Sequence, residues 1–414
     1  MRSAYWIKND IRINDNTALK SFCEQSSEGL IFWCADKNFY RLSEFKKQAV
    51  MQALGNLNEK LKAYRQKIIL FKKPLIEILP ALINELKIEK LFYTLEYGYY
   101  EKLEEQKINQ AAKEKNVQIE NFDQATLVAE KNLPFSLDRM PLVFTDFRKK
   151  IESALIIEKP VAKPDRFPAQ IELTLNLQSF VDTNPIEVTQ DSSEDQLLER
   201  MNHYFWETES VLTYKDTRNG LLDINDSTRF SRGLNLGSLS ARTVYAELKK
   251  FEVTVKANES TYWVMFELLW RDYFKFFSLK HGNKIFLRDG LKSTSTRKYK
   301  FSGQDKAKFL QWCEGKTDSR FINANMNELN ETGWMSNRGR QNVASYLIHD
   351  LKCPWTWGAA YFEKKLVDYD VDLNWGNWLY LSGQGSDPRS RVFNIERQAD
   401  MYDPGGLYQK KWTV

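Results

Sequence analysis

Gly-Trp-Met-Ser-Asn-Arg-Gly-Arg-Gln-Asn-Val-Ala-Ser occupies residues 333–345, and Val-Asp-Tyr-Asp-Val-Asp-Leu-Asn-Trp-Gly-Asn-Trp occupies residues 367–378. These segments mix arginine, amide, acid and tryptophan more densely than ordinary helices do, because core helices are aliphatic and solvated helices carry few indoles. Tryptophans beside arginines and amides indicate a pocket for a flat, charged ligand that bears phosphates. The same residues could equally serve nucleic-acid bases and phosphates.

The first part of the chain alternates short apolar segments with helical ones. Strands are predicted at residues 4–7, 30–34, 68–71 and 90–94, and helices at residues 43–66, 74–86 and 100–116. Short buried strands that alternate with helices indicate a parallel sheet covered on both faces. The first turn lacks the glycine-rich dinucleotide fingerprint, so we do not expect a dinucleotide cofactor to bind there.

The rest of the chain differs in character. Frequent prolines and little periodicity mark residues 123–191 as a connector. From Ser192 onward nearly every segment is helical, with Gly and Asn between helices. We therefore predict an α/β N-terminal domain with a parallel, Rossmann-like sheet at residues 1–122, the connector, and a large all-α C-terminal domain at residues 192–414.

Composition argues against several classes of protein. No apolar run approaches the ~20 residues that span a bilayer, and charged Lys8 and Asp10 come too early for a signal peptide. The four cysteines and three histidines show no ligand spacing, so no metal site is expected. We expect a cytoplasmic monomer that has no membrane partner.

Positive charge and indoles gather in the second half of the chain. Residues 1–195 carry a net charge of −1 and residues 196–414 carry +6, and ten of the twelve tryptophans lie in the latter. This combination suits nucleic acid, because phosphates supply affinity and bases stack on rings. A charge of +6 over such a length is common, so the pattern alone is a weak indication.

A hydroxyl-rich segment precedes a helix predicted to begin near Ser240. Thr228-Arg229-Phe230-Ser231 and Gly237-Ser238-Leu239-Ser240 place hydroxyls and backbone N–H groups at a helix entrance, which is a natural cradle for phosphate. The alternative is a plain Ser or Thr helix cap, which is the commoner meaning of such a segment.

Two further sets of side chains fall on single helix faces. Glu267, Trp270 and Arg271 are spaced i, i+3 and i+4, and Asn337 and Arg340 are spaced i and i+3. A carboxyl group beside an indole and a guanidinium is costly to bury without a purpose. The alternative is a surface Glu–Arg pair with the indole in the core.

Motifs in one order along the whole chain resemble the photolyase/cryptochrome flavoproteins, and the DASH cryptochromes most of all. The resemblance rests on residues 5–16, 214–222, 227–242, 263–286, 333–378 and 394–412, and it is weak between about residues 123 and 196. Tyr380 favours the DASH branch, because ordinary photolyases often have a second dimer-stacking tryptophan there. The resemblance implies FAD as the cofactor and leaves open a methenyltetrahydrofolate antenna.

The resemblance also implies roles for individual residues. FAD would be bound by Tyr214, Ser227, Thr228, Arg229, Phe230, Ser231, Glu267, Arg271, Asn337, Arg340, Asp368, Asp370 and Asn374. DNA would be contacted by Arg218, Trp270, Arg271, Asn337, Arg338, Arg391 and Gln398. Catalysis would use Glu267, Trp270, Asn337, Asn374 and Tyr380, with Trp378 and Trp355 in an electron-carrying tryptophan chain, and Glu101 would contact the antenna.

Acid and amide side chains lie within the second quoted segment. Asp368, Asp370 and Asn374 are expected between two helices. By the resemblance they would lie near the flavin, where a carboxylate and an amide could tune its protonation. Ordinary loop capping by Asp and Asn is the alternative.

The chain departs from the family pattern at two places. Ser231-Arg232-Gly233-Leu234 stands where relatives usually have Ser-Pro-Trp-Leu, which puts the rigidity of that loop in question. Ser302 stands where the family pattern has the third tryptophan of the electron chain. Its substitute could be Tyr299, Phe301, Trp312 or Trp357.

These features lead to one function and two alternatives. The favoured interpretation is a light-driven, FAD-dependent photolyase that splits cyclobutane pyrimidine dimers, with a preference for single-stranded DNA. One alternative is a blue-light photoreceptor with little or no repair activity. The other is a nucleic-acid-binding protein without flavin.

Overall fold

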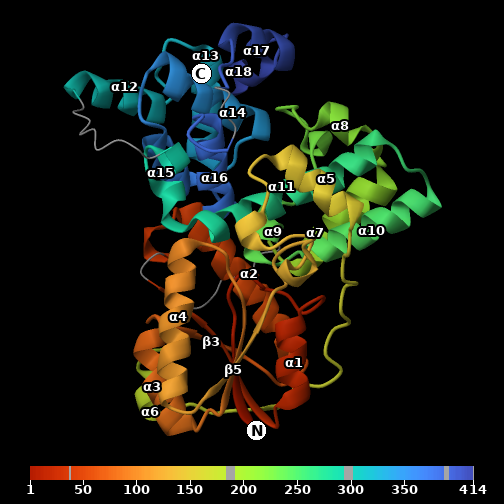
Figure 1. Cartoon of the computed structure of the whole chain (residues 1–414), viewed down its shortest axis with the longest axis vertical. Coiled ribbons are helices and arrows are strands. Elements are labelled where there is room, and N and C mark those ends of the chain that lie inside the picture. The colour runs from red at the N-terminus through yellow and green to blue at the C-terminus, as the bar shows by residue number, and fades with distance from the viewer. Residues whose placement is uncertain (37–38, 183–191, 293–301, 387–390, 414) are drawn as a thin grey trace.

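The computed structural model describes residues 1–36, 39–182, 192–292, 302–386 and 391–413. Two bodies lie end to end in Figure 1, an α/β body formed by the start of the chain and a helical body formed by its second half. The N-terminus lies at the far end of the α/β body, and the C-terminus lies at the far end of the helical body.

A parallel sheet forms the centre of the α/β body. Its strands are β1 (Arg2–Trp6), β2 (Glu28–Cys34), β3 (Ile68–Phe71), β4 (Lys90–Thr94), β5 (Gln118–Phe122) and β6 (Ala169–Gln170). The strand order is β3-β2-β1-β4-β5, and β6 pairs with β2. Ala4 of β1 lies between Leu30 of β2 and Leu91 of β4. Such continuous apolar strands form because both faces of the sheet are covered.

Helices cover the two faces of the sheet. α1 (Thr17–Gln25) and α2 (Glu44–Lys62) pack on one face, and α3 (Leu75–Leu86) and α4 (Tyr99–Glu114) pack on the other (Figure 1). Tyr5 and Phe92 contribute to the first core, whereas their chain neighbours Trp6 and Tyr93 contribute to the second. This alternation follows from the two-residue period of a strand.

The structure confirms the predicted fold class of an α/β part followed by a helical part. The four predicted strands and three predicted helices are present, with ends that differ by a few residues. Strand β5 was missed because Gln-Ile-Glu-Asn-Phe lies at the sheet edge and none of its residues is fully buried. An edge strand does not need the apolar run that identifies a central one.

The connector is more ordered than its sequence indicates. It contributes β6 to the sheet and α5 (Phe144–Ser153) and α6 (Leu175–Gln178) to the packing. Phe144, Phe147 and Ile151 of α5 belong to the core of the helical body. The domain limits at residues 122 and 192 therefore stay a prediction, since the connector packs on both bodies.

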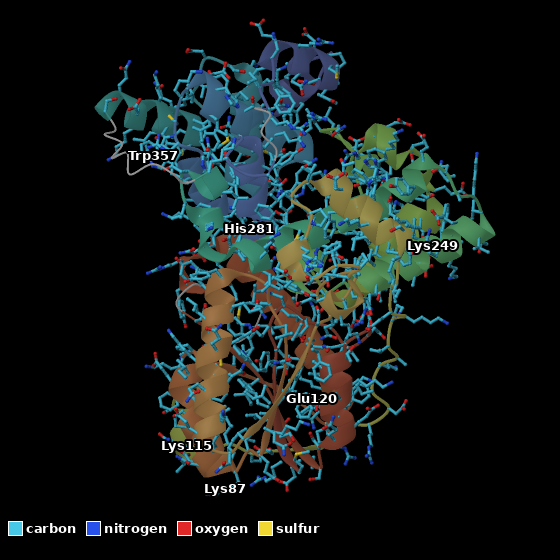
Figure 2. The ribbon with its side chains drawn as sticks, viewed as in Figure 1. Lys87, Lys115, Glu120, Lys249, His281 and Trp357 are labelled. Atoms are coloured by element: carbon cyan, nitrogen blue, oxygen red, sulfur yellow. The ribbon has the colours of Figure 1, made fainter. Side chains whose placement is uncertain are left out.

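The helical body is built around α11 (Glu259–His281). The other helices are α7 (Glu194–Asn202), α8 (Tyr214–Thr217), α9 (Ser231–Leu236), α10 (Ala241–Thr254), α12 (Gly303–Cys313), α13 (Arg320–Thr332), α14 (Asn337–Ser345), α15 (Trp355–Lys365), α16 (Val371–Leu381), α17 (Ile395–Tyr402) and α18 (Leu407–Trp412). α11 begins with a capping box at Asn258 and is largely buried. Figure 2 places His281, the last residue of α11, where the two bodies meet. Across the described ranges, no helix is long and apolar enough to cross a bilayer.

Candidate functional site

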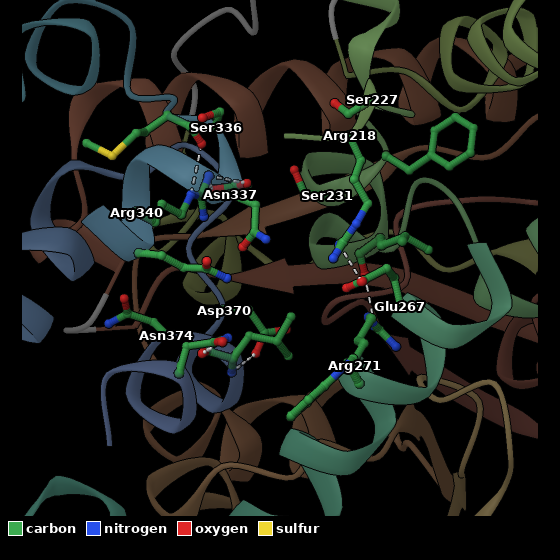
Figure 3. A pocket seen from close by; sticks show the side chains of 18 of the residues that line it. Arg218, Ser227, Ser231, Glu267, Arg271, Ser336, Asn337, Arg340, Asp370 and Asn374 are labelled. Carbon is green, nitrogen blue, oxygen red and sulfur yellow. Dashed lines mark hydrogen bonds and ion pairs between the residues drawn. The ribbon is translucent and has the colours of Figure 1, made fainter. Parts of the chain in front are cut away.

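A cavity of about 530 Å³ opens within the helical body, between α11, the segment joining α8 to α9, α14 and α16. In Figure 3, Glu267 and Arg271 project from α11 on one side, and Asn337, Arg340 and Asn374 lie on the opposite side. This volume lies in the range of pockets that bind organic ligands and cofactors.

The segment between α8 and α9 supplies one wall, through Ser227, Thr228 and Arg229. Arg229 has a left-handed backbone, with φ at 61°, and its guanidinium lies 3.4 Å from the centre of the Trp334 ring. Its Nε is buried and has no hydrogen-bond partner within the described part of the chain. The helix that follows begins after Phe230, which provides no side-chain cap. A buried cation and hydroxyls beside an uncapped helix start suit a phosphate group.

Acids on the opposite side are held by cations. Arg340 donates to the two carboxylate oxygens of Asp368 at 3.0 and 2.9 Å. Lys275 Nζ lies 3.0 Å from a carboxylate oxygen of Asp370 and 3.3 Å from one of Asp372. Asp368 and Asp370 line the cavity, so this wall presents carboxylates whose charge is already balanced.

The pKa values of these acids follow from burial and from the neighbouring cations. Burial acts to raise the pKa of Asp368, but the Arg340 charge outweighs it and holds the pKa below its ordinary value. Burial is likewise outweighed at Asp370, where Lys275 lowers the pKa. At Asp372 burial dominates, and the pKa is raised. The two cavity-lining acids are therefore ionised at neutral pH.

Asn374 lies inside α16 and lines the cavity. Its amide donates to the Ala359 carbonyl at 3.0 Å, which fixes the orientation of the side chain. The expectation that Asn374 lies between two helices is therefore wrong. The helix begins earlier because Asp370 caps it, accepting from the backbone N–H groups of Asp372 and Leu373.

Rings, guanidinium groups and a carboxyl group meet on the α11 side. The ring centres of Trp270 and Tyr380 lie 5.6 Å apart, with their planes at 70°. Glu267 accepts a hydrogen bond from Arg218, and the Tyr380 hydroxyl accepts one from Arg391. Burial raises the pKa of Glu267, although the Arg218 charge opposes that shift. This corner can receive a flat polar ring attached to a charged backbone.

Comparison with known proteins identifies the family. Residues 263–414 match the FAD binding domain of DNA photolyase, and residues 3–166 match DNA photolyase. The Cryptochrome DASH of Gloeobacter violaceus is 36% identical over 98% of this chain and 84% of its own length. The chain belongs to the photolyase/cryptochrome family.

Solved structures of photolyases and cryptochromes share the fold. The crystal structure of the Synechocystis sp. cryptochrome has a TM-score of 0.91 and 33% identity, covering 100% of this chain and 88% of its own. The archaeal photolyase from Sulfolobus tokodaii, solved with two FAD molecules, has a TM-score of 0.79 and 22% identity, covering 100% of this chain and 90% of its own. FAD is the cofactor of this family domain, and the helical body carries that domain.

The structure brings every residue predicted to bind FAD to one cavity. Its lining includes Tyr214, Ser227, Thr228, Arg229, Phe230, Ser231, Glu267, Arg271, Asn337, Arg340, Asp368, Asp370 and Asn374. Arg218, Trp270, Trp378, Tyr380 and Arg391 line it as well. Their individual roles toward FAD and DNA stay predictions, which the placement supports.

Arg271 is a wall residue. The residue is 9% exposed, and its guanidinium donates to the backbone carbonyls of Ala125 and Leu234. A contact with the DNA backbone needs a guanidinium at the surface. The predicted DNA contact of Arg271 stays a prediction, and α11 uses this side chain to hold the connector and the α9 helix.

Arg338 and Gln398 lie outside the lining of this cavity, within the described ranges. The Arg338 guanidinium lies 4.8 Å from the centre of the Tyr402 ring on α17, the helix that also carries Gln398. The predicted DNA contacts of both residues stay predictions, and they would belong to the surface of α14 and α17 and not to the cavity.

Trp378 lines the cavity, whereas Trp355 is outside the lining, and both indoles are buried. The Trp355 ring lies 5.9 Å from Trp375, and the Trp378 ring lies 6.3 Å from Trp312. Ser302 caps α12 by accepting from a backbone N–H, so a polar N-cap occupies the place of the missing tryptophan.

Two of the four proposed substitutes for that tryptophan have described positions. Trp312 is fully buried and lies between Trp378 and Phe309. Phe309 in turn lies 5.2 Å from Trp357, which Figure 2 shows on the side of the helical body away from Lys249. Tyr299 and Phe301 lie outside the described residues.

Glu101 lines a second cavity of about 580 Å³, where the α/β body meets the helical body. Its Oε2 is buried without a hydrogen-bond partner in the described part of the chain. Burial, and then the nearby charges of Glu96 and Asp372, raise the pKa of Glu101 to about 8. Leu234 and Asp370 line both cavities, so the two share a wall.

Three residues of the site were missed from the sequence. Lys275 follows Arg271 by four residues on α11, so helical spacing could have found it. Trp334, which stacks on Arg229, lies within the first quoted segment but had no assigned role. Phe144 stacks on Trp270 from the connector, where the sequence gives no periodic signal.

Proposed function

We propose that this chain is an FAD-dependent, light-driven enzyme that splits cyclobutane pyrimidine dimers in DNA. One observation carries the proposal. The cavity combines a phosphate-binding wall with a corner of two rings and a carboxyl group, formed by Trp270, Tyr380 and Glu267. Bound FAD would supply an electron on illumination. The residues of the chain would bind, orient and shield the reacting groups.

The polar walls of the cavity fit the two ends of FAD. The diphosphate would lie against Ser227, Thr228 and Arg229, where the buried Nε of Arg229 needs an acceptor. The flavin ring would lie towards Asn374 and Asp370, where a fixed amide and an ionised carboxylate present polar atoms. The balanced charges of Asp370 and Lys275 would let that wall face a neutral ring without an unpaired ion.

The Trp270 corner suits a pyrimidine dimer turned out of its strand. Glu267 has a raised pKa and can exchange hydrogen bonds with the polar edge of a thymine. Trp270 and Tyr380, with their planes at 70°, offer two inclined faces for rings that are not coplanar. Stacking a base on an aromatic side chain contributes about 1–3 kcal/mol.

We propose a preference for single-stranded DNA. Flipping a base out of a duplex costs a few kcal/mol, and the cost is least in a single strand. The guanidinium groups that line the cavity on this side, Arg218 and Arg391, are engaged with Glu267 and Tyr380, which leaves fewer cations there to offset duplex opening.

A repair assay in light and in darkness tests this function. Chemically reduced protein is mixed with oligonucleotides that carry one thymine dimer, in single-stranded and double-stranded form. We expect repair in the light, none in darkness, and faster repair of the single strand. Equal dimer content after light and dark incubation would contradict the proposal.

A second candidate is a blue-light photoreceptor, favoured by the cryptochrome names of the relatives. It predicts normal FAD content and a light-dependent change in flavin absorption, together with no loss of dimers in the same assay. The repair assay therefore separates the two candidates in one experiment.

The second cavity is the proposed antenna site, with Glu101 as a ligand. A buried carboxyl group without a partner suits a ring that donates N–H groups, as a pterin does. The second FAD of the Sulfolobus tokodaii photolyase shows that one member of the fold holds two chromophores. We keep folate as the proposed antenna, a monomer as the proposed state and the cytoplasm as the proposed compartment, where the four buried, unbridged cysteines would stay reduced.

A further inference from the structure

One face of the Trp270 indole is covered by a residue from the connector. The ring centres of Phe144 and Trp270 lie 3.6 Å apart, and their planes differ by 12°. Most aromatic pairs in proteins are offset or edge-on with centres 4.5–7 Å apart, so this is an unusually full overlap. Phe144 is the first residue of α5 and is 5% exposed.

The covered face is the one turned away from the cavity. Trp270 lines the cavity, and within the described ranges Phe144 does not. The indole also meets Tyr380 edge-on at 5.6 Å and Phe274 at 5.5 Å, the latter with planes only 27° apart, and both of these residues line the cavity. Tyr273 meets it edge-on at 5.6 Å. A base that enters the cavity therefore approaches Trp270 from the side of Tyr380 and Phe274, and not from the side that Phe144 covers.

Phe144 is itself held from several sides. Its ring meets Phe266 at 5.2 Å and 85° and Tyr273 at 5.7 Å and 78°. The Tyr273 hydroxyl donates to the carbonyl of Leu142, two residues before Phe144. Tyr273 thus fixes both the ring and the backbone that carries it, and α11 supplies all of these contacts.

We propose that Phe144 is a positioning residue for dimer recognition. Its ring, which overlaps the Trp270 indole more closely than Phe274 does, sets the plane of the indole, so that its cavity side is ready to receive the flipped base. An indole with no ring behind it can rotate between rotamers, and fixing it when the base binds costs side-chain entropy. The inference rests on the proposed repair function, since it assigns Phe144 to the recognition of the dimer.

The test compares dark binding of two oligonucleotides by the FAD-loaded protein. The single strands share one sequence, and one carries a thymine dimer. The measured quantity is the ratio of their dissociation constants. We expect Phe144→Leu to lower this preference for the dimer about tenfold, which is part of the stacking energy of one base. Phe144→Met serves as a second ringless variant, and Phe144→Tyr, which keeps the ring, should retain the preference.

Phe147→Leu is the matched control. Phe147 lies on the same helix and is fully buried, and its ring neighbours include Phe135, Phe144, Tyr273 and Phe276. Within the described ranges its ring neighbours do not include Trp270. It should lower the thermal midpoint as Phe144→Leu does and leave the binding ratio within about twofold. In a Trp270→Ala background, Phe144→Leu should lower the ratio no further, because both variants remove the same interaction.

Each outcome is decisive. A wild-type protein that binds both strands equally overturns the proposed function and this inference with it. If the wild type prefers the dimer and Trp270→Ala loses that preference, an unchanged ratio in Phe144→Leu overturns the inference alone. The inference also fails if Phe147→Leu lowers the ratio equally, or if Phe144→Leu still lowers it without Trp270.

Discussion

The two cavities are similar in size and share a wall, yet they differ in whether their buried acids are paired with cations. In the first cavity, of about 530 Å³, the lining acids Asp368 and Asp370 are paired with cations. In the second, of about 580 Å³, Glu101 is buried without a hydrogen-bond partner in the described ranges. The first cavity therefore keeps ionised acids, and at Arg229 it has a guanidinium whose Nε lacks a hydrogen-bond partner in the described ranges. The second keeps a protonated acid that suits a donor ligand.

This difference shows how one protein can prepare two sites for different ligands. A balanced carboxylate fixes geometry without repelling electron-rich ligands. An isolated buried carboxyl group is destabilising when charged, so it favours a ligand that donates hydrogen bonds. The shared wall, which includes Leu234 and Asp370, separates the two sites by a few side chains.

The largest expected effect is on the light-driven reduction of FAD, which we assign to the first cavity. Trp378 lines only the first, and Trp378→Phe should nearly abolish light-driven reduction of oxidised FAD, because the proposed indole relay begins there. Repair by chemically reduced protein should survive. Absorption spectra under blue light measure the first property, and dimer assays measure the second.

Trp206→Phe is the control for the relay, since Trp206 packs against Phe251 away from the cavity. Photoreduction at the wild-type rate in Trp378→Phe would show that the relay starts at another side chain.

A large loss of stability is expected when a carboxylate that is paired with a cation is replaced by a neutral side chain. Asp368→Asn removes the charge of the buried partner of Arg340, whose own side chain is 26% exposed, and losing hydrogen bonds to a charged group costs about 1.5–3 kcal/mol. The pKa of Asp368 is lowered in the folded state, so its contribution is present at neutral pH and is lost as the pH falls through that value. Urea unfolding of wild type and variant at pH 7 and pH 3 measures this. If wild type and variant differ in unfolding free energy by the same amount at both pH values, the assignment of Asp368 as ionised would be contradicted.

Loss of the phosphate-side cation should weaken cofactor binding by a smaller amount. Arg229→Ala removes a charge-assisted hydrogen bond, which contributes about 1.5–3 kcal/mol. We expect at least about tenfold faster loss of FAD on dialysis. Arg232→Ala, three residues along the same segment and outside the cavity lining, should retain FAD as the wild type does. Equal retention in both variants would remove Arg229 from the FAD site.

The smallest effect is expected at the second cavity, where replacing the acid should stabilise the folded protein and not destabilise it. The folded-state pKa of Glu101 is raised from an ordinary value of 4.5 to about 8, so the folded protein loses stability as the pH rises from 4.5 to about 8. Glu101→Gln should change the thermal midpoint little at pH 4 and raise it by roughly 2–4 °C at pH 9. Glu114→Gln, exposed on the same helix, should change neither. If Glu101→Gln lowers the thermal midpoint at pH 9, the ionised carboxylate must be stabilised by partners in the folded protein.

The sequence was sufficient for elements whose burial is complete. Strands β1 to β4 are apolar on both faces and were found, whereas β5 is half-exposed at the edge and was missed. The convergence of Ser227, Glu267 and Asn374 on one cavity came from the resemblance, since spacing alone placed each on a separate helix or loop. Confirmation of the common cavity needed coordinates.

Contacts between distant segments were beyond sequence reasoning. Phe144 reaches Trp270 from a connector whose prolines and weak periodicity hid a helix. Asn374 was placed in a loop because the cap at Asp370, which starts α16 before it, is set by the side chain of one residue. Such positions depend on tertiary packing, which local pattern does not encode.

The most direct test of the account is dimer repair by three reduced proteins under blue light. Wild type, Glu267→Ala and Trp270→Ala are compared on the same single-stranded oligonucleotide, with bound FAD quantified in each sample. We predict equal FAD content, repair by the wild type, and repair reduced by about tenfold or more in both variants. Wild-type repair rates in either variant, at equal FAD content, would contradict the claim that this corner of the cavity receives the dimer.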